Sequence, residues 1–273
     1  MSPSGPTLEA LRGFAHELAD LADARSLPAF REHYAPGAGQ RGVVETKPDG
    51  TPVTAIDRDI ERALRTAIRT RFPDHAVLGE EDGLEGPDHA PRWVLDPIDG
   101  TRNFVAGNPV FATLIALQID GQEVLGVASA PALGSRWDGM RGGPARQDRR
   151  EVRVRATTVL EQAQVSFGGL GYFPAAGRGA ALSALTAATA RQRGFGDFWQ
   201  HCLVAAGVLD LALEAQVSLW DLAAVRAIVE AAGGRFTDLD GRPTAAGGSA
   251  LSSNGHLHDE VLALLAHSTD RHG

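Results

Sequence analysis

Acidic side chains follow apolar runs in three separate parts of the chain. Glu80, Glu81 and Asp82 come after AVLG, Asp96 and Asp99 close RWVLDPID, and Asp221 follows a tryptophan. Buried strands deliver side chains to their ends, and carboxylates are the hard oxygen ligands that Mg²⁺ prefers. The sequence therefore predicts a divalent-metal site to which distant parts of the chain contribute.

The segment from Asp96 to Thr101 has the pattern of a built site. Its two aspartates stand three apart around Pro97, which fixes the backbone, and the Ile98 carbonyl between them can face the same way. Gly100 and Thr101 open a predicted short helix, RNFVAG, whose free N–H groups suit a phosphate.

Each of these features, taken alone, also fits a simpler structural role. A Glu-Glu-Asp run is typical of a solvated turn, and Asp-Pro and Asp-Gly are common turn dipeptides. Asp221 could cap a helix through its carboxylate. The sequence has no HExxH motif and no CxxC pair, so a zinc cage is not expected.

Charge and composition limit the classes of partner. The 273-residue chain is 43% hydrophobic, with a net charge of −8 and a pI of about 5.6. An acidic chain is a poor match for nucleic acid or an anionic membrane. No secretory signal or transmembrane run is visible, so we expect a cytoplasmic protein, and the single cysteine, Cys202, is expected to be a buried thiol.

Hydrophobic periodicity predicts a mixture of helices and paired strands, hence an α/β (α+β) fold. Helices are expected over 7–33, 57–71, 199–213 and 222–232, with a closing helix at HDEVLALLAHS. Strands are expected at AVLG, RWVLD, EVRVRATT, QAQVSFG and RGFGDF, with a hairpin turning at Asp120-Gly121. Residues 141–151 are predicted to be a polar surface loop, with an N-terminal α+β subdomain over 1–140 and a C-terminal α/β subdomain over 141–273.

Three blocks together resemble the inositol monophosphatase-like superfamily: GEEDG at 79–83, WVLDPIDGTRNF at 93–104 and WDLAAVRAIVEAAGG at 220–234. Within it, the basic residue after DGT and the element GDFW are similar to bacterial histidinol-phosphate phosphatases of the actinobacterial type. The resemblance implies a layered αβαβα sandwich, a homodimer and two or three Mg²⁺ ions in each active site.

The resemblance also implies roles for individual residues. The metal ligands would be Glu80, Asp96, the Ile98 carbonyl, Asp99 and Asp221. The catalytic residues would be Glu80 and Thr101, which orient the attacking water, and Asp57. The substrate contacts would be Asp99, Gly100, Thr101, Asp197, Glu214 and Asp221. Lys47 and Asp57 match a loop region beside the metals.

The function implied is hydrolysis of a small phosphorylated metabolite, L-histidinol phosphate, by a metal-activated water, as a step of histidine biosynthesis. Asp197 and Glu214 would then attract the amine or the imidazole. Residues 141–151 form a shorter segment than the family pattern leads us to expect. That departure leaves open inositol 1-phosphate, a nucleotide or another metabolite as the substrate. A catalytically inactive metal- or phosphate-binding homologue is a further alternative.

Overall fold

A computed structural model describes residues 6–38, 44–46 and 52–267 of the chain. It begins with α1 (Leu8–Ala29), which Thr7 caps by accepting the Ala10 N–H at 3.2 Å. A short π-helix, η1 (Phe30–Tyr34), continues it, and α2 (Ala55–Arg71) follows. Both predicted N-terminal helices are thus confirmed.

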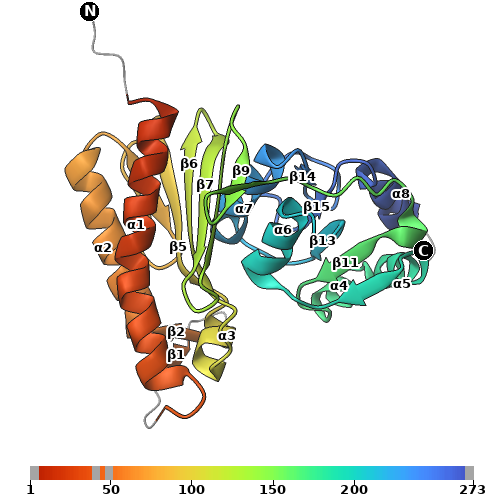
Figure 1. Ribbon diagram of the computed structural model, residues 1–273, viewed down its shortest axis with the longest axis horizontal. Coiled ribbons are helices and arrows are strands. Elements are labelled where there is room, and N and C mark those ends of the chain that lie inside the picture. The colour runs from red at the N-terminus through yellow and green to blue at the C-terminus, as the bar shows by residue number, and fades with distance from the viewer. Residues whose placement is uncertain (1–5, 39–43, 47–51, 268–273) are drawn as a thin grey trace, which may run out of the picture.

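The first sheet contains eight strands in the described part of the chain, in the order β10-β9-β8-β7-β6-β5-β3-β4. In chain order they are β3 (Ala76–Gly79), β4 (Gly83–Glu85), β5 (Arg92–Asp99), β6 (Ala112–Ile119), β7 (Gln122–Ala130), β8 (Ser135–Met140), β9 (Ala145–Gln147) and β10 (Arg150–Val152). Helices α1 and α2 cover one face of this sheet (Figure 1). Beside it lie a two-stranded pair, β1 (Val44–Thr46) with β2 (Pro52–Thr54), and the short helix α3 (Thr101–Ala106).

The second sheet has five strands within the described residues, in the order β12-β11-β13-β15-β14. They are β11 (Gln164–Phe167), β12 (Arg191–Arg193), β13 (Leu211–Glu214), β14 (Arg235–Thr237) and β15 (Ala250–Ser253). The helices around this sheet are α4 (Tyr172–Ala175), α5 (Gly179–Ala188), α6 (Asp197–Ala205), α7 (Leu219–Ala231) and α8 (His258–His267), and η2 (Leu160–Gln162) is a single 3₁₀ turn.

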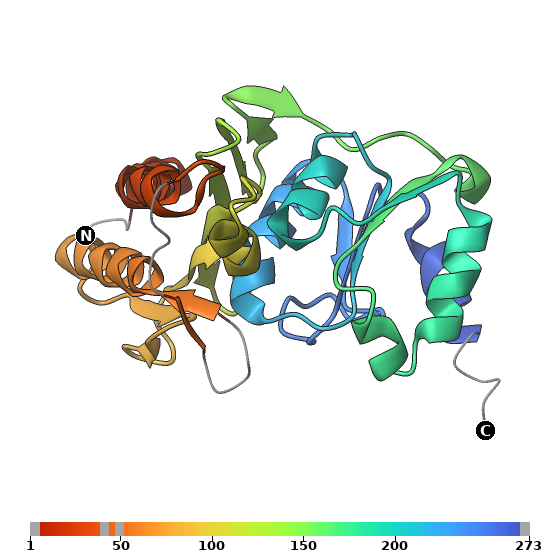
Figure 2. The same cartoon turned by 90° about the horizontal axis from the view of Figure 1, so that it is seen from below.

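Helices α6 and α7 lie between the two sheets, and α4, α5 and α8 lie on the outer side of the second (Figures 1 and 2). The layers therefore alternate helix, sheet, helix, sheet, helix, which confirms the predicted αβαβα sandwich. Separate apolar clusters fill the spaces between the layers. Cys202 is buried in the central one, as expected.

Helix α7 lies against the first sheet at a point where the sheet has no side chain. A Cβ atom on Gly126 of β7 would stand 2.1 Å from the Ala224 carbonyl oxygen of α7. Only glycine allows this approach, so the position of α7 relative to β7 is closely fixed.

Some elements differ from the sequence-based expectation. The prediction of a helix over 199–213 was wrong in its second half, because α6 ends at Ala205 and Leu211–Glu214 forms the strand β13. Gly207, at φ +68°, supplies the turn. All four residues of β13 are buried between neighbouring strands. Its sequence therefore lacks the alternation of apolar and polar residues that marks a half-exposed strand, and it reads as a continuation of the apolar helix before it. The strand expected at RGFGDF was also wrong, because α6 begins at Asp197.

Residues 141–151 are not simply a loop, which corrects the expectation. They include β9 and the start of β10, paired through a turn in which Asp148 and Arg149 both have positive φ. The strand expected at EVRVRATT ends at Val152. The first sheet thus extends to Val152, and the division at residue 140 stays a proposal. Among the helices that the structure describes, none combines the length and the apolar character needed to cross a membrane.

Candidate active site

Asp96 and Asp99 project from the end of β5 to the same side, although residues three apart on a regular strand face opposite sides. The cause is a bulge. Asp96 pairs with Leu114 of β6 and Asp99 pairs with Ala112, so β5 has one residue more than its partner over this stretch. The Pro97 carbonyl is held there by the Thr113 hydroxyl, which donates to it at 2.8 Å. The bulge turns both carboxylates toward one cavity.

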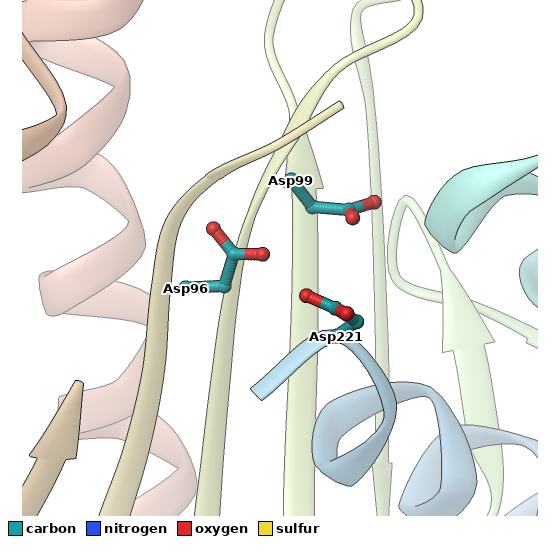
Figure 3. A group of neighbouring side chains, drawn as sticks. All are labelled: Asp96, Asp99 and Asp221. Carbon is teal, nitrogen blue, oxygen red and sulfur yellow. The ribbon is translucent and has the colours of Figure 1, made fainter. Parts of the chain in front are cut away.

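Asp221 joins them from the first turn of α7, and the three side chains lie together beside the end of β5 (Figure 3). One oxygen of each lies within 4.8 Å of the others. Asp221 also serves its helix, since its Oδ2 accepts the Ser218 N–H at 2.8 Å. The cap is Ser218 and not Asp221, and the helix-end role and the site role of Asp221 coexist.

Burial makes this cluster of like charges unfavourable by itself. Burial raises the pKa of Asp96 well above its usual range, and the carboxylates of Glu80 and Asp99 add to the effect. Burial and the neighbouring Asp197 do the same to the pKa of Asp99, and burial raises the pKa of Asp221 to about 7. Asp96 Oδ1 is buried without a hydrogen-bond partner among the described residues. An all-oxygen cluster of this kind fits a hard divalent cation, which would balance the charge.

Glu80 enters the same cavity from the end of β3, which runs parallel to β5. Its N–H donates to the Leu95 carbonyl at 3.2 Å. Glu61 of α2 holds the rest of the turn, accepting the N–H groups of Glu81 at 2.8 Å and Asp82 at 3.0 Å. Glu61 is fully buried and paired with Arg65 at 2.8 Å, so α2 fixes the backbone on which Glu80 stands.

Thr101 and Asp57 form a chain of polar contacts at the edge of the cavity. The Thr101 hydroxyl lies 2.9 Å from the Ile98 carbonyl and 3.5 Å from Asp57 Oδ1. Asp57 Oδ2 accepts both the N–H and the hydroxyl of Thr54, at 2.8 and 2.6 Å, in the capping box of α2. Burial raises the pKa of Asp57.

Most of the predicted site residues line one cavity of about 210 Å³, namely Glu80, Asp96, Ile98, Asp99, Gly100, Thr101, Asp197 and Asp221. A second cavity of about 380 Å³, here called the side cavity, is lined by Glu214 and shares Asp99, Arg102, Asp197 and Asp221 with the first. Asp57 contacts Thr101 without lining either cavity. Lys47 lies outside the described residues.

Besides Asp99 and Asp221, two further acidic residues, Asp197 and Glu214, line the side cavity. Asp197 begins α6 at φ 49° and accepts the Asn103 side-chain amide at 2.7 Å, and Glu214 accepts from Gln200. Burial raises the pKa of both carboxyls, most strongly that of Glu214, whose pKa is raised further by Asp197.

Glu61 and Arg102 were not assigned to the site from the sequence. Arg102 lines both cavities, and in the sequence it served only as a mark of resemblance. Glu61 and Arg65 form an i, i+4 pair beside the apolar face of α2, but exposed helices carry the same pattern. Their burial follows from the packing of α2 and is not visible in the spacing.

The model of the inositol monophosphatase family matches residues 15–270. The chain belongs to this family. Among the curated members, a histidinol-phosphatase of Mycobacterium tuberculosis is 46% identical over 81% of this chain and 87% of that protein. A histidinol-phosphatase of Streptomyces coelicolor is 43% identical over 92% of this chain and 95% of its own length.

Solved structures of the inositol monophosphatase family share the fold. An IMPase of Thermotoga maritima is 31% identical, with a TM-score of 0.83 over 96% of this chain and 98% of that one. An inositol monophosphatase of Zymomonas mobilis has the same TM-score and identity over 96% of this chain and 99% of its own.

Proposed function

We propose that this member of the inositol monophosphatase family is a Mg²⁺-dependent phosphomonoesterase that hydrolyses L-histidinol phosphate to L-histidinol and phosphate. The observation that carries the proposal is the convergence of Asp96, Asp99 and Asp221 beside an acidic side cavity. The high identity to two actinobacterial histidinol-phosphatases supports the choice of substrate. We also propose, as the resemblance implies, that the enzyme is a cytoplasmic homodimer and that it acts in histidine biosynthesis.

The proposed metal ligands are Glu80, Asp96, the Ile98 carbonyl, Asp99 and Asp221. Mg²⁺, when bound, supplies charge neutralisation for the phosphate dianion, activation of a water molecule and stabilisation of the leaving alkoxide. The resemblance implies two or three ions; the five proposed ligands all border the cavity, and Mg²⁺ completes its coordination with waters.

The residues of the chain would position the other reactants. Thr101 donates its hydroxyl proton to the Ile98 carbonyl or to Asp57, which leaves oxygen lone pairs free to accept from the attacking water. Glu80 would hold the same water from the end of the neighbouring parallel strand β3. Backbone N–H groups at Gly100 and Thr101, with the Arg102 guanidinium, would contact the phosphate oxygens.

The side cavity would receive the organic half of the ester. Asp197 and Glu214 place negative charge there, which attracts the ammonium or imidazole of histidinol. An uncharged polyol such as inositol would gain less from these groups. The alternative substrate inositol 1-phosphate is still worth testing, because an inositol-1-monophosphatase of Mycolicibacterium smegmatis is 34% identical over 90% of this chain.

The test is phosphate release from L-histidinol phosphate, inositol 1-phosphate and fructose 1,6-bisphosphate, each with Mg²⁺ and with a chelator. We expect activity only with Mg²⁺ and a kcat/KM at least about tenfold higher for histidinol phosphate, since paired polar contacts discriminate strongly. An equal or greater kcat/KM for inositol 1-phosphate would overturn the proposed substrate. Full activity in the chelator would overturn the proposed mechanism.

A further inference from the structure

His201 of α6 borders the side cavity and is only 1% exposed. Its Nδ1 lies 2.7 Å from the hydroxyl of Ser252 on β15. Its Nε2 is buried and has no hydrogen-bond partner in the part of the chain that the structure describes. A buried ring nitrogen without a partner is costly to stability, so a ligand that supplied the partner would relieve that cost.

The surroundings of His201 contain acceptors of hydrogen bonds. Asp197 stands four residues before it, on the same face of α6. Glu214 lies on β13, whose Ala212 pairs with Ser252, so the hydroxyl that contacts His201 Nδ1 stands on the strand next to the one that carries Glu214. A ligand that suits two carboxylates here must bring hydrogen-bond donors, and positively charged N–H groups are the strongest donors to carboxylates.

A second buried histidine shows what a purely structural imidazole looks like in this chain. His258 lies 2.7 Å from the Ser253 hydroxyl through Nδ1 and 3.0 Å from the Thr237 hydroxyl through Nε2. Both of its nitrogens are therefore satisfied inside the protein, and it borders neither of the two cavities of the site. His201 differs from His258 in two respects: its Nε2 has no partner among the described residues, and its side chain belongs to a residue that borders the side cavity.

We propose that Nε2 of His201 accepts a hydrogen bond from a nitrogen of the organic half of the substrate, and that His201 thereby determines substrate preference. This inference rests on the proposed function. In the tautomer required, Nδ1–H donates to Ser252 Oγ and the Nε2 lone pair is free. Burial lowers the pKa of His201 to about 3, so the imidazole is neutral and has a lone pair at physiological pH.

The test compares two amide replacements. His201→Asn keeps a polar group near the place of Nδ1 and loses Nε2, whereas His201→Gln keeps an amide oxygen near the place of Nε2. We expect His201→Asn to raise the KM for L-histidinol phosphate about tenfold, the loss of one buried hydrogen bond. Its kcat, and its KM for glycerol 2-phosphate, which lacks nitrogen, should stay within about twofold. His201→Gln should recover most of the affinity.

Three further measurements separate binding from folding. Calorimetric titration with L-histidinol, which is not turned over, should show that His201→Asn binds it about tenfold more weakly than the wild type does. Ser252→Ala leaves the imidazole in place but frees its tautomer, and should raise the KM about threefold. The matched control, His258→Asn, should lower the melting temperature and leave both KM values unchanged.

Two results for His201→Asn would overturn the inference while the proposed function stands: an equal rise in KM for L-histidinol phosphate and glycerol 2-phosphate, or an unchanged KM for L-histidinol phosphate. A wild-type enzyme without turnover of L-histidinol phosphate would overturn the proposed function and this inference with it. If His201→Asn does not fold, an unchanged KM in Ser252→Ala is the result that overturns the role of His201.

Discussion

Asp96 is maintained at a cost to the stability of the metal-free protein. Its carboxylate is buried, one oxygen lacks a partner within the described residues, and neighbouring carboxylates raise its pKa. A residue that served only the fold would be placed differently. Asp238 is equally buried, but its Oδ1 accepts the N–H groups of Asp240 at 2.9 Å and Arg242 at 2.8 Å.

The contrast between these two aspartates predicts opposite effects for two similar substitutions. Asp96→Asn should lower phosphate release by roughly 100-fold or more, because a metal ligand is lost. The same change should raise the melting temperature in a chelator, because it removes charge repulsion. Asp238→Asn, the control, should lower stability by about 1–3 kcal/mol and leave turnover intact. A fully active Asp96→Asn enzyme would contradict the site.

Glu61 carries a second prediction at this scale. Glu61→Gln leaves Arg65 buried without its counter-charge and should cost about 3 kcal/mol of unfolding free energy. Because Glu61 also holds the turn beneath Glu80, kcat should fall about 10-fold to 100-fold. The control is Glu85→Gln, since Glu85 is a half-exposed partner of Arg65 and should contribute less than about 1 kcal/mol. Steady-state kinetics measures the change in kcat, and thermal unfolding measures the change in stability. An unchanged kcat in Glu61→Gln would exclude a role of Glu61 in positioning Glu80.

The residues that a sequence can reveal are those in dense local motifs. Asp96, Asp99 and Thr101 stand within six positions, and the structure places all of them at one cavity. His201 and Glu61 carry no such local signal. Their significance comes from burial and from an unsatisfied or shared contact, and these depend on which helix packs against which sheet.

At the scale of elements, periodicity served well where one face of a segment is exposed. It predicted α1, α2 and the β6–β7 hairpin, whose Asp120 and Gly121 both have positive φ as a two-residue turn requires. It failed at β13, which is buried on both faces. The bulge in β5 was not predicted either, although the proline at its centre is the kind of residue that bulges accommodate.

The close approach of α7 to β7 allows a test of how an element positions a side chain. Gly126→Ala should displace α7, and with it Asp221, because its methyl group would overlap the Ala224 carbonyl. We expect a loss of about 1–3 kcal/mol in stability together with reduced turnover. Gly13→Ala is the matched control at an exposed position of α1, where nothing lies within 4 Å of the added Cβ, and it should stabilise the protein by about 0.5–1 kcal/mol. Wild-type turnover in Gly126→Ala would show that α7 does not depend on this contact.

At the scale of the whole molecule, the acidic site should make stability depend on pH and Mg²⁺ together. The pKa of Asp221 is about 7 in the folded chain, against an ordinary value of 3.8. The folded state therefore binds more protons than the unfolded state between these values, and without metal its stability falls as pH rises through this window. Magnesium binds the deprotonated carboxylates and should offset the loss.

We therefore expect the melting temperature in a chelator to decrease from pH 5 to pH 8. Mg²⁺ at a concentration about 100 times its Kd should raise the melting temperature by several degrees at pH 8, because a ligand that binds only the folded state stabilises it. At pH 5 the rise should be small, because protons compete for the same carboxylates. Differential scanning calorimetry at both pH values measures the effect. A Mg²⁺ shift that is as large at pH 5 as at pH 8 would contradict the proposed ligands.

The contact of α7 with the first sheet also bears on how such a protein can diversify. Because α7 is seated on β7, Asp221 belongs to the same rigid unit as Asp96 and Asp99, and the groups that hold the cation form one module. Glu214 of the side cavity lies instead on β13 of the second sheet and does not border the metal cavity. Mutations there can exchange one leaving alcohol for another across generations without dismantling the reaction centre.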